Sequence, residues 1–183
     1  MGKEDTMNIT VYLASAPGND PCYAETAEKL GSWIAESGHT LVYGGANDGT
    51  MGIIADSCLK HGGKAIGVMP GFLAARGRKH EGLTEILLTA TMAERKAKMI
   101  ELGDVFIALP GGPGTLEEIS EVISCVRLGI LDKPVILLNV NGYYDPLHEM
   151  FRRMVDTGFL SREDYGVIHF VDTIEEIVQL CSC

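Results

Sequence analysis

Apolar segments alternate with amphipathic segments along the whole chain. Short runs rich in β-branched and aromatic residues predict buried strands, and they lie at 8–14, 40–43, 64–69, 83–89, 104–109, 135–139 and 167–171. Between them, apolar residues spaced three and four apart predict helices at 21–37, 51–61, 92–102, 116–130 and 143–158, with a last helix after Asp172. The alternation predicts an α/β fold, a doubly wound, Rossmann-like parallel sheet with helices on both faces. We expect one domain over 1–183, with residues 1–7 as a flexible extension.

Capping residues mark several of the predicted helix ends. Asp20 before Pro21 is typical of an N-cap followed by a helix-opening proline. Thr91 and Asp172 are expected to cap the helices that follow them. The segment 72–82, which holds Arg78 and other basic residues, is expected to be a loop.

Three polar or glycine-rich turns follow predicted strands. They contain Ser15, the segment 44–50 and the segment 110–115. Ligands in doubly wound sheets bind beyond the carboxyl ends of the strands. Because all three turns fall at that edge, the sequence predicts a single site that includes Ser15 and Gly45.

The turn from Pro110 to Glu118 has the features of a phosphate cradle. Glycines let the backbone approach an anion, and the first turn of a helix offers unpaired N–H donors. Thr115 adds a hydroxyl donor. Glu117 and Glu118 would repel a phosphate, so either one complements the helix dipole or at least one serves the sugar of the substrate.

Composition excludes several classes of partner and chemistry. The net charge of −10 argues against nucleic acid, and no apolar run approaches the length of a membrane span. The odd count of five cysteines favours a reducing cytoplasm, and neither they nor the scattered histidines have metal-ligand spacing. The turn at 44–50 resembles a P-loop but lacks its lysine, and the chain has neither a G-x-G-x-x-G motif for NAD nor a G-x-S-x-G motif for a serine hydrolase.

The predicted helix 92–102 carries an unusual face. Met92, Arg95, Lys96 and Met99 share it by their spacing. The plain alternative is that the two cations pair with Glu94 or Glu101 on the surface. Because this helix immediately precedes the strand before the glycine turn, the guanidinium of Arg95 could hold a phosphate or a base in the site.

Cations, an anion cradle and a carboxylate together suit a phosphorylated sugar. Cleavage of an N-glycosidic bond passes through a state with positive charge on the sugar, which a nearby carboxylate stabilises. The same carboxylate could activate water.

Two long motifs resemble those of the LOG ("lonely guy") family, cytokinin riboside 5′-monophosphate phosphoribohydrolases. Residues 110–118 meet the signature P-G-G-x-G-T-x-x-E, and residues 92–99 meet M-x-x-R-K-x-x-M. The segments 43–52, 132–135 and 138–144 also resemble the family, although Ala46 replaces a glycine. The resemblance covers nearly the whole chain.

The resemblance implies hydrolysis of a nucleoside 5′-monophosphate to free base and ribose 5-phosphate, without a metal or other cofactor. It implies catalytic roles for Arg95 and Glu118 and a homodimer, although the apolar stripe from Leu116 to Ile130 is expected to face the core. We place the substrate against Ser15, Gly45, Met92, Lys96, Gly111, Gly112, Pro113, Gly114, Thr115, Leu116 and Glu117.

One departure from the family pattern affects base preference. Members commonly have a glutamate in the loop before the R-K helix, and Gly77 occupies that place here. The base could therefore be adenine rather than an N6-prenylated relative. The alternative function is a nucleotide- or cofactor-binding carrier without turnover. An older family label, lysine decarboxylase, does not fit, because Lys96 beside Arg95 is poorly placed to be the neutral amine of a Schiff base.

Overall fold

A computed structural model describes residues 6–181, which form one sheet of seven parallel strands in the order β4-β3-β2-β1-β5-β6-β7. This order confirms the predicted doubly wound fold. The strands are β1 Asn8–Tyr12, β2 Thr40–Tyr43, β3 Lys64–Pro70, β4 Glu85–Thr89, β5 Val105–Ala108, β6 Val135–Leu138 and β7 Ile168–Val171. The helices are α1 Pro21–Glu36, α2 Gly49–Lys60, α3 Gly71–Ala74, α4 Met92–Leu102, α5 Pro113–Arg127, α6 Asp145–Asp156, α7 Arg162–Gly166 and α8 Ile174–Cys181, with a 3₁₀ turn, η1, at Val140–Gly142.

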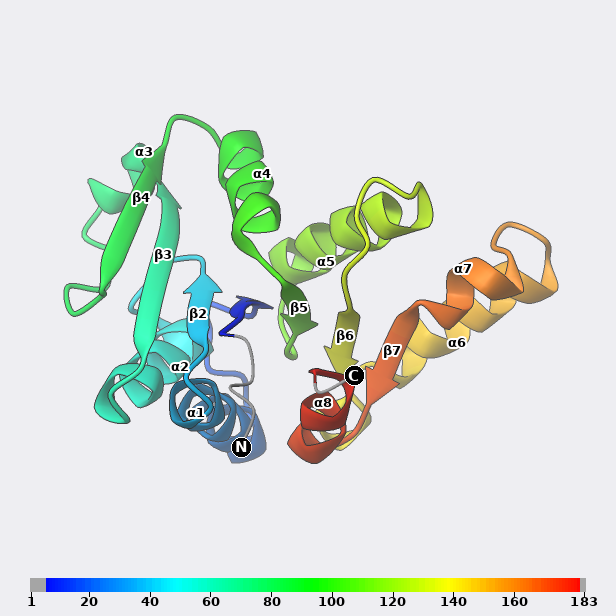
Figure 1. Cartoon of the computed structure of the whole chain (residues 1–183), viewed down its shortest axis with the longest axis horizontal. Helices are drawn as coiled ribbons and strands as arrows, with labels where there is room; N and C mark the ends of the chain where they lie inside the picture. Colours follow the sequence, from blue (N-terminus) through cyan, green and yellow to red (C-terminus); the bar gives the residue numbers. More distant parts are fainter. Residues whose placement is uncertain (1–5, 182–183) are drawn as a thin grey trace.

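The sheet separates two apolar cores. One lies under α1, α2 and α8 and includes Leu30, Ile54 and Ile177, while the other lies under α4, α5 and α6 and includes Met99 and Ile119. Figure 1 shows the strands fanning from β4 to β7, with α1, α2 and α8 below them and α4 and α5 above. The central strands are buried on both faces, which explains why they are continuous apolar runs.

The direction in which successive strands are added to the sheet reverses between β1 and β5. These strands are neighbours, with Ile9 opposite Val105, and they lead to helices on opposite faces. Such a switch point opens a crevice beyond the carboxyl ends of the two strands. The turns that follow β1 and β5 therefore meet at one place.

Several element boundaries differ from the sequence-based expectations. Helix α5 begins at Pro113 rather than at 116, so Glu117 and Glu118 lie in its second turn and do not complement the first-turn dipole. The expected basic loop begins with the short helix α3, and α7 was not expected. The cap of α8 is Thr173 rather than Asp172, because Thr173 Oγ1 accepts the N–H of Glu176 while the Glu176 carboxylate accepts the N–H of Thr173.

The apolar stripe on α5 divides between core and surface. Ile119 and Ile123 are buried in the core, as expected, whereas Leu116 and Ile130 are exposed. Residues 1–5 of the expected extension lie outside the described residues. Met7, the last residue of that extension, accepts the N–H of Thr40 on β2 at 2.9 Å through its carbonyl.

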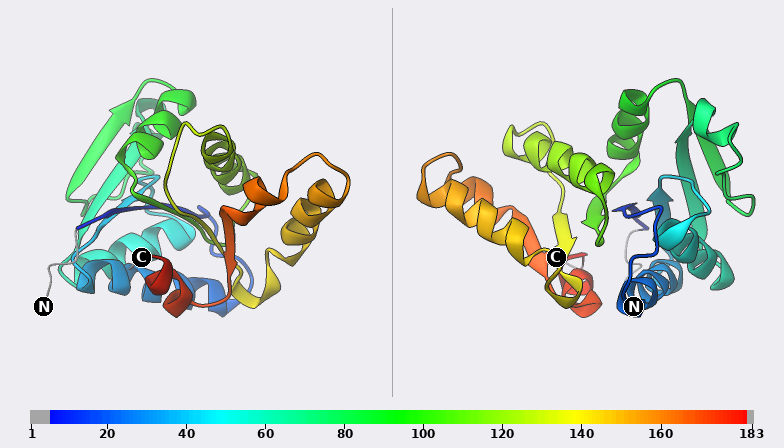
Figure 2. Two further views of the ribbon diagram at one scale, coloured as in Figure 1. Left: turned by 45° about the vertical axis from the view of Figure 1, so that its right-hand side comes forward. Right: turned by 180° about the vertical axis from the view of Figure 1, so that it is seen from behind.

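Helices α6 and α7 form an arm beyond β7. Figure 2 shows the arm projecting from the end of the sheet in both views. Helix α6 has no fully buried residue. Within residues 6–181, no helix is both long and apolar enough to cross a membrane.

Candidate active site

A cavity of about 350 Å³ opens at the carboxyl edge of the sheet, beyond β1, β2 and β5. Strand β1 leads to Ser15, β2 leads to Gly44, and β5 leads to the start of α5 at Gly112 to Thr115. Helix α4 adds Met92 and Arg95, and α5 adds Glu118. The three turns singled out in the sequence thus border one cavity, as expected.

An ion pair between Arg95 and Glu118 lies in the wall of this cavity. Nη1 of Arg95 donates to Oε1 of Glu118, and Nε donates to the carbonyl of Val68 on β3 at 3.0 Å. Both side chains are about 94% removed from solvent. The surface pairing of Arg95 with Glu94 or Glu101, considered as the plain alternative, does not occur in the structure.

The guanidinium also depends on a glycine in the turn after β2. A Cβ on Gly44 would overlap Nη2 of Arg95 and would lie 3.2 Å from Cε of Met51. The guanidinium is therefore held between β3, α5 and the β2 turn. Its planar fork serves a carbonyl and a carboxylate in different directions, which a lysine amine could not do with the same geometry.

Burial is the largest influence on the pKa of the Glu118 carboxylate. Removal from water raises the pKa of Glu118 above its ordinary value, and the positive charge and hydrogen bond of Arg95 offset part of that rise. The pKa of Glu118 therefore stays above its ordinary value although a cation is in contact with the carboxylate.

The glycine turn shapes the start of α5. Gly112 is the N-cap and Pro113 opens the helix, so the first N–H groups of α5 remain outside the helical hydrogen-bond pattern. Thr115 is buried and lines the cavity, and its side chain fills the space that a Cβ on Gly111 would need. The turn brings backbone donors to the cavity, as an anion site requires.

Lys96 and Glu117 do not line the cavity and pair with each other. Nζ of Lys96 lies 2.8 Å from Oε1 of Glu117 and 2.9 Å from Oε2 of Glu121. These bonds, first to Glu117 and then to Glu121, raise the pKa of Lys96. A raised pKa favours the ammonium form, the opposite of what a Schiff-base lysine needs.

The predicted substrate residues divide into two groups. Those that line the cavity are Ser15, Met92, Gly112, Pro113, Gly114 and Thr115, together with Arg95 and Glu118. Those that belong to the same turns and helices without lining it are Gly45, Lys96, Gly111, Leu116 and Glu117. Gly45 has a φ of 78° and accepts the N–H of His80 at 3.0 Å.

Arg78 is a cavity residue that the sequence did not assign to the site. The carbonyl of Arg78 accepts the N–H of Asn47 at 3.0 Å, and a bridge joins Ala46 to Lys79. These contacts bring the basic segment against the β2 turn, and Arg78 lines the cavity. Its Nη1 lies 3.7 Å from Oδ2 of Asp48. The basic run was the available signal, but only the fold shows which of its members faces the cavity.

Apolar side chains complete the lining. They are Leu13, Met51, Met69, Leu73 and Met92.

Gly77, which marks the departure from the family pattern, has a φ of 73°, and its Cβ position has no heavy atom within 4 Å. Any other residue there would carry the strain of left-handed backbone.

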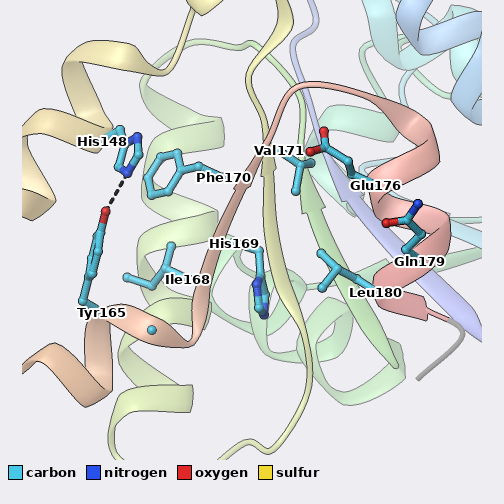
Figure 3. Close-up of a pocket in the computed structure, with 10 residues that line it drawn as sticks. His148, Tyr165, Ile168, His169, Phe170, Val171, Glu176, Gln179 and Leu180 are labelled. Carbon is cyan, nitrogen blue, oxygen red and sulfur yellow. Dashed lines mark hydrogen bonds between the residues drawn. The ribbon is translucent and has the colours of Figure 1, made fainter.

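A second hollow of about 500 Å³ lies beside β7 and is less suited to a phosphorylated ligand. Figure 3 shows the His148 ring beside that of Phe170, and Nε2 of His148 bonded to the Tyr165 hydroxyl at 2.5 Å. Burial lowers the pKa of His169, and Glu176 already caps α8. No lysine or arginine lines this hollow within the described part of the chain.

Among residues 6–181, no group of three or more histidine, cysteine, aspartate or glutamate side chains is arranged to hold a metal ion.

The chain is similar to a known family over most of its length. A family model described as "possible lysine decarboxylase" matches residues 51–181. A cytokinin riboside 5′-monophosphate phosphoribohydrolase of Rhodococcoides fascians is 45% identical over 84% of this chain and 78% of its own. The corresponding enzyme LOG of Oryza sativa subsp. japonica is 42% identical over 93% of this chain and 70% of its own.

The chain is similar to solved structures in its fold, although the sequence identity is low. The molybdenum cofactor binding protein of Rippkaea orientalis superposes with a TM-score of 0.74, covering 96% of this chain and 95% of its own, at 24% identity. At that identity the likeness concerns the fold alone.

Proposed function

Because this chain belongs to the LOG family of phosphoribohydrolases, we propose that it hydrolyses the N-glycosidic bond of a nucleoside 5′-monophosphate. The products are a free base and ribose 5-phosphate. The observation that carries the proposal is the buried Arg95–Glu118 pair in the wall of a cavity that also contains the start of α5.

The cavity offers a distinct surface for each part of such a substrate. The N–H groups of Gly112, Gly114 and Thr115 and the positive end of α5 suit the phosphate. The carboxylate of Glu118 suits the ribose, where positive charge develops. The thioethers of Met51, Met69 and Met92 suit a flat, apolar base.

Glu118 has two tasks in the proposed reaction. Its negative charge stabilises the oxocarbenium-like ribose as the bond from C1′ to the base nitrogen breaks and its electron pair leaves with the base. The oxygen of a water molecule bonds to C1′ and keeps one proton as the new hydroxyl, while the other water proton passes to Glu118. Glu118 then gives that proton to the released base, which restores the carboxylate. The raised pKa of Glu118 favours proton uptake at that moment.

Arg95 acts as a fixed cation rather than as an acid. A guanidinium does not lose its proton in proteins, so it is unsuited to protonating the leaving base. Its bonds to Val68 and Glu118 orient the carboxylate, and its charge offsets part of the rise that burial causes in the pKa of Glu118.

A carrier without turnover is the alternative function. Binding a nucleotide through the glycine turn would use the start of α5 but would not require a buried carboxylate near the sugar. A carboxylate with a raised pKa in a cavity is an arrangement that favours proton transfer. We therefore favour the hydrolase.

We further propose a cytoplasmic homodimer. Large apolar side chains remain exposed at Leu128, Ile130 and Phe159, at 67%, 72% and 81% of their surface, and a contact with a second copy would cover such side chains. Cys22, Cys58, Cys125 and Cys181 are free thiols, in keeping with a reducing compartment.

The proposal is tested by incubating the protein with adenosine 5′-monophosphate and with its N6-isopentenyl analogue, following free base by chromatography. We expect release from at least one nucleotide, and the ratio of the two rates gives the base preference that Gly77 leaves open. Glu118→Gln should abolish release, while Glu101→Gln, on the outer surface of α4, should not. Tight binding of both nucleotides without release would favour the carrier.

A further inference from the structure

The segment after β6 contacts the glycine turn, and its two tyrosines do not line the cavity. Asn139 organises this segment, because its Oδ1 accepts the N–H of Tyr144 at 2.6 Å and its Nδ2 donates to Asp145 at 2.8 Å and Asp172 at 3.1 Å. Asn141 has a φ of 52°, which turns the chain sharply before two consecutive tyrosines. The loop is therefore held in one conformation by side-chain hydrogen bonds, and this conformation fixes the positions of Tyr143 and Tyr144.

Both tyrosine hydroxyls donate to carbonyls at the end of β5. The hydroxyl of Tyr144 bonds to the Leu109 carbonyl at 2.7 Å, and the hydroxyl of Tyr143 bonds to the Gly111 carbonyl. Tyr144 is buried in the core under α5, whereas Tyr143 is 41% exposed. Tyr144 thus anchors the strand end, and Tyr143 contacts the turn itself.

The geometry of the peptide bond connects Tyr143 to the cavity. In a trans peptide the C=O and the following N–H point in opposite directions, and the described residues contain no cis peptide. Holding the Gly111 carbonyl toward Tyr143 therefore points the N–H of Gly112 away from Tyr143. Gly112 lines the cavity, whereas Tyr143 does not.

We propose that Tyr143 is a positioning residue for the 5′-phosphate of the substrate. Its hydroxyl fixes the Gly111–Gly112 peptide, so that the Gly112 N–H is oriented before the phosphate arrives. Glycine peptides rotate easily, and a free one would have to be ordered at each binding event. This inference rests on the proposed function, since it assumes that the ligand carries a phosphate at this turn.

The ring of Tyr143 is held independently of its hydroxyl. It meets the ring of Tyr23 edge-on at a centroid distance of 6.0 Å and that of Tyr144 at 5.1 Å. Phenylalanine can keep these contacts and lacks only the bond to Gly111. Tyr143→Phe therefore isolates the effect of the hydroxyl.

The test compares the binding of three compounds by calorimetry: adenosine 5′-monophosphate, ribose 5-phosphate and adenosine. In Tyr143→Phe we expect both phosphorylated compounds to bind roughly threefold to tenfold more weakly, the effect of one lost neutral hydrogen bond, with adenosine unchanged. Tyr165→Phe is the matched control, because it loses a hydroxyl bond to His148 beside the other hollow. In steady-state kinetics the loss should raise KM more than it lowers kcat.

Two results would overturn the proposal. Unchanged binding of the phosphorylated compounds would show that the hydroxyl does not orient the turn, and equal weakening of adenosine would indicate general distortion of the cavity. Binding of ribose 5-phosphate, a product, is measured without turnover, so a wild type that binds the phosphorylated compounds but releases no base would refute the hydrolase while leaving the phosphate-selective effect of Tyr143→Phe measurable. A wild type that binds neither phosphorylated compound would refute both.

Discussion

Removing the carboxylate of Glu118 should destabilise the protein strongly, because it leaves a buried guanidinium without its counter-charge. The side chains of Arg95 and Glu118 are 6% and 7% exposed, and the Val68 carbonyl would remain with Arg95. Breaking a buried pair on one side costs about 3–5 kcal/mol. Against a total stability of about 5–15 kcal/mol for a domain, Glu118→Ala should shift the unfolding curve visibly.

Urea unfolding of three variants tests this expectation. Glu118→Gln keeps an oxygen that can accept a hydrogen bond from Arg95 and loses only the charge. Its loss in the free energy of unfolding should therefore be smaller than that of Glu118→Ala, by at least about 1 kcal/mol. Glu101→Gln, in a surface pair with Lys98, should change the free energy of unfolding by about 0.5 kcal/mol or less. A cost below about 1 kcal/mol for Glu118→Ala would refute the view that the pair is buried and mutually dependent.

The raised pKa of Glu118 gives this comparison a pH dependence with a definite sign. Between the ordinary carboxyl pKa, about 4.3, and the raised pKa of the folded state, the folded protein binds more protons than the unfolded chain. The stability of the wild type relative to Glu118→Gln should therefore fall as pH rises through that window, and then level off. A relative stability that rises with pH would mean that Arg95 outweighs burial.

Three further predictions concern activity and assembly. The acid limb of kcat/KM for base release should lie above the ordinary carboxyl range, because Glu118 must be ionised to stabilise the ribose; a limb at or below about pH 4.3 would contradict this. Gly44→Ala should displace Arg95, costing about 1–3 kcal/mol in urea unfolding and most of the base release, whereas Gly166→Ala, where a Cβ meets nothing within 4 Å, should be tolerated; equal behaviour of the two would remove the steric argument. Phe159→Ser should shift the molar mass in light scattering toward a monomer if its exposed ring lies in the dimer interface, and an unchanged dimer would place that interface elsewhere.

The sequence predicted the architecture well because the strands carry their own signal. The run from Val135 to Leu138 is buried, and a central parallel strand covered on both faces accommodates four consecutive apolar residues in this way. The crossover rule and the turn composition then placed the cavity at the correct edge. Boundaries were less certain, since Pro113 can either end a turn or open a helix, and α5 begins there.

The candidate site was only partly predictable. Glu117 and Glu118 are chemically identical neighbours, and although the family resemblance implied different roles for them, their local spacing did not show which one is buried. The start of α5 at Pro113 turns Glu118 toward Arg95 and leaves Glu117 outside with Lys96. Local spacing is insufficient for such assignments, because the partner helix α4 decides which face is buried.

Arg78 and Tyr143 illustrate contacts that depend on distant segments. Arg78 reaches the cavity because Asn47 donates to its carbonyl, and Tyr143 reaches Gly111 across 32 positions of sequence. Neither pairing has a local signature. The family resemblance covered the segment that contains Tyr143 but implied no role for that residue.

The most direct test of the proposed function is the stoichiometry of the reaction products. We predict that the purified protein converts a nucleoside 5′-monophosphate into equal amounts of free base and ribose 5-phosphate, and that Glu118→Gln binds the same nucleotide without converting it. Nucleotide that remains intact with the wild type, or base release that survives in Glu118→Gln, would contradict the role assigned to the buried carboxylate.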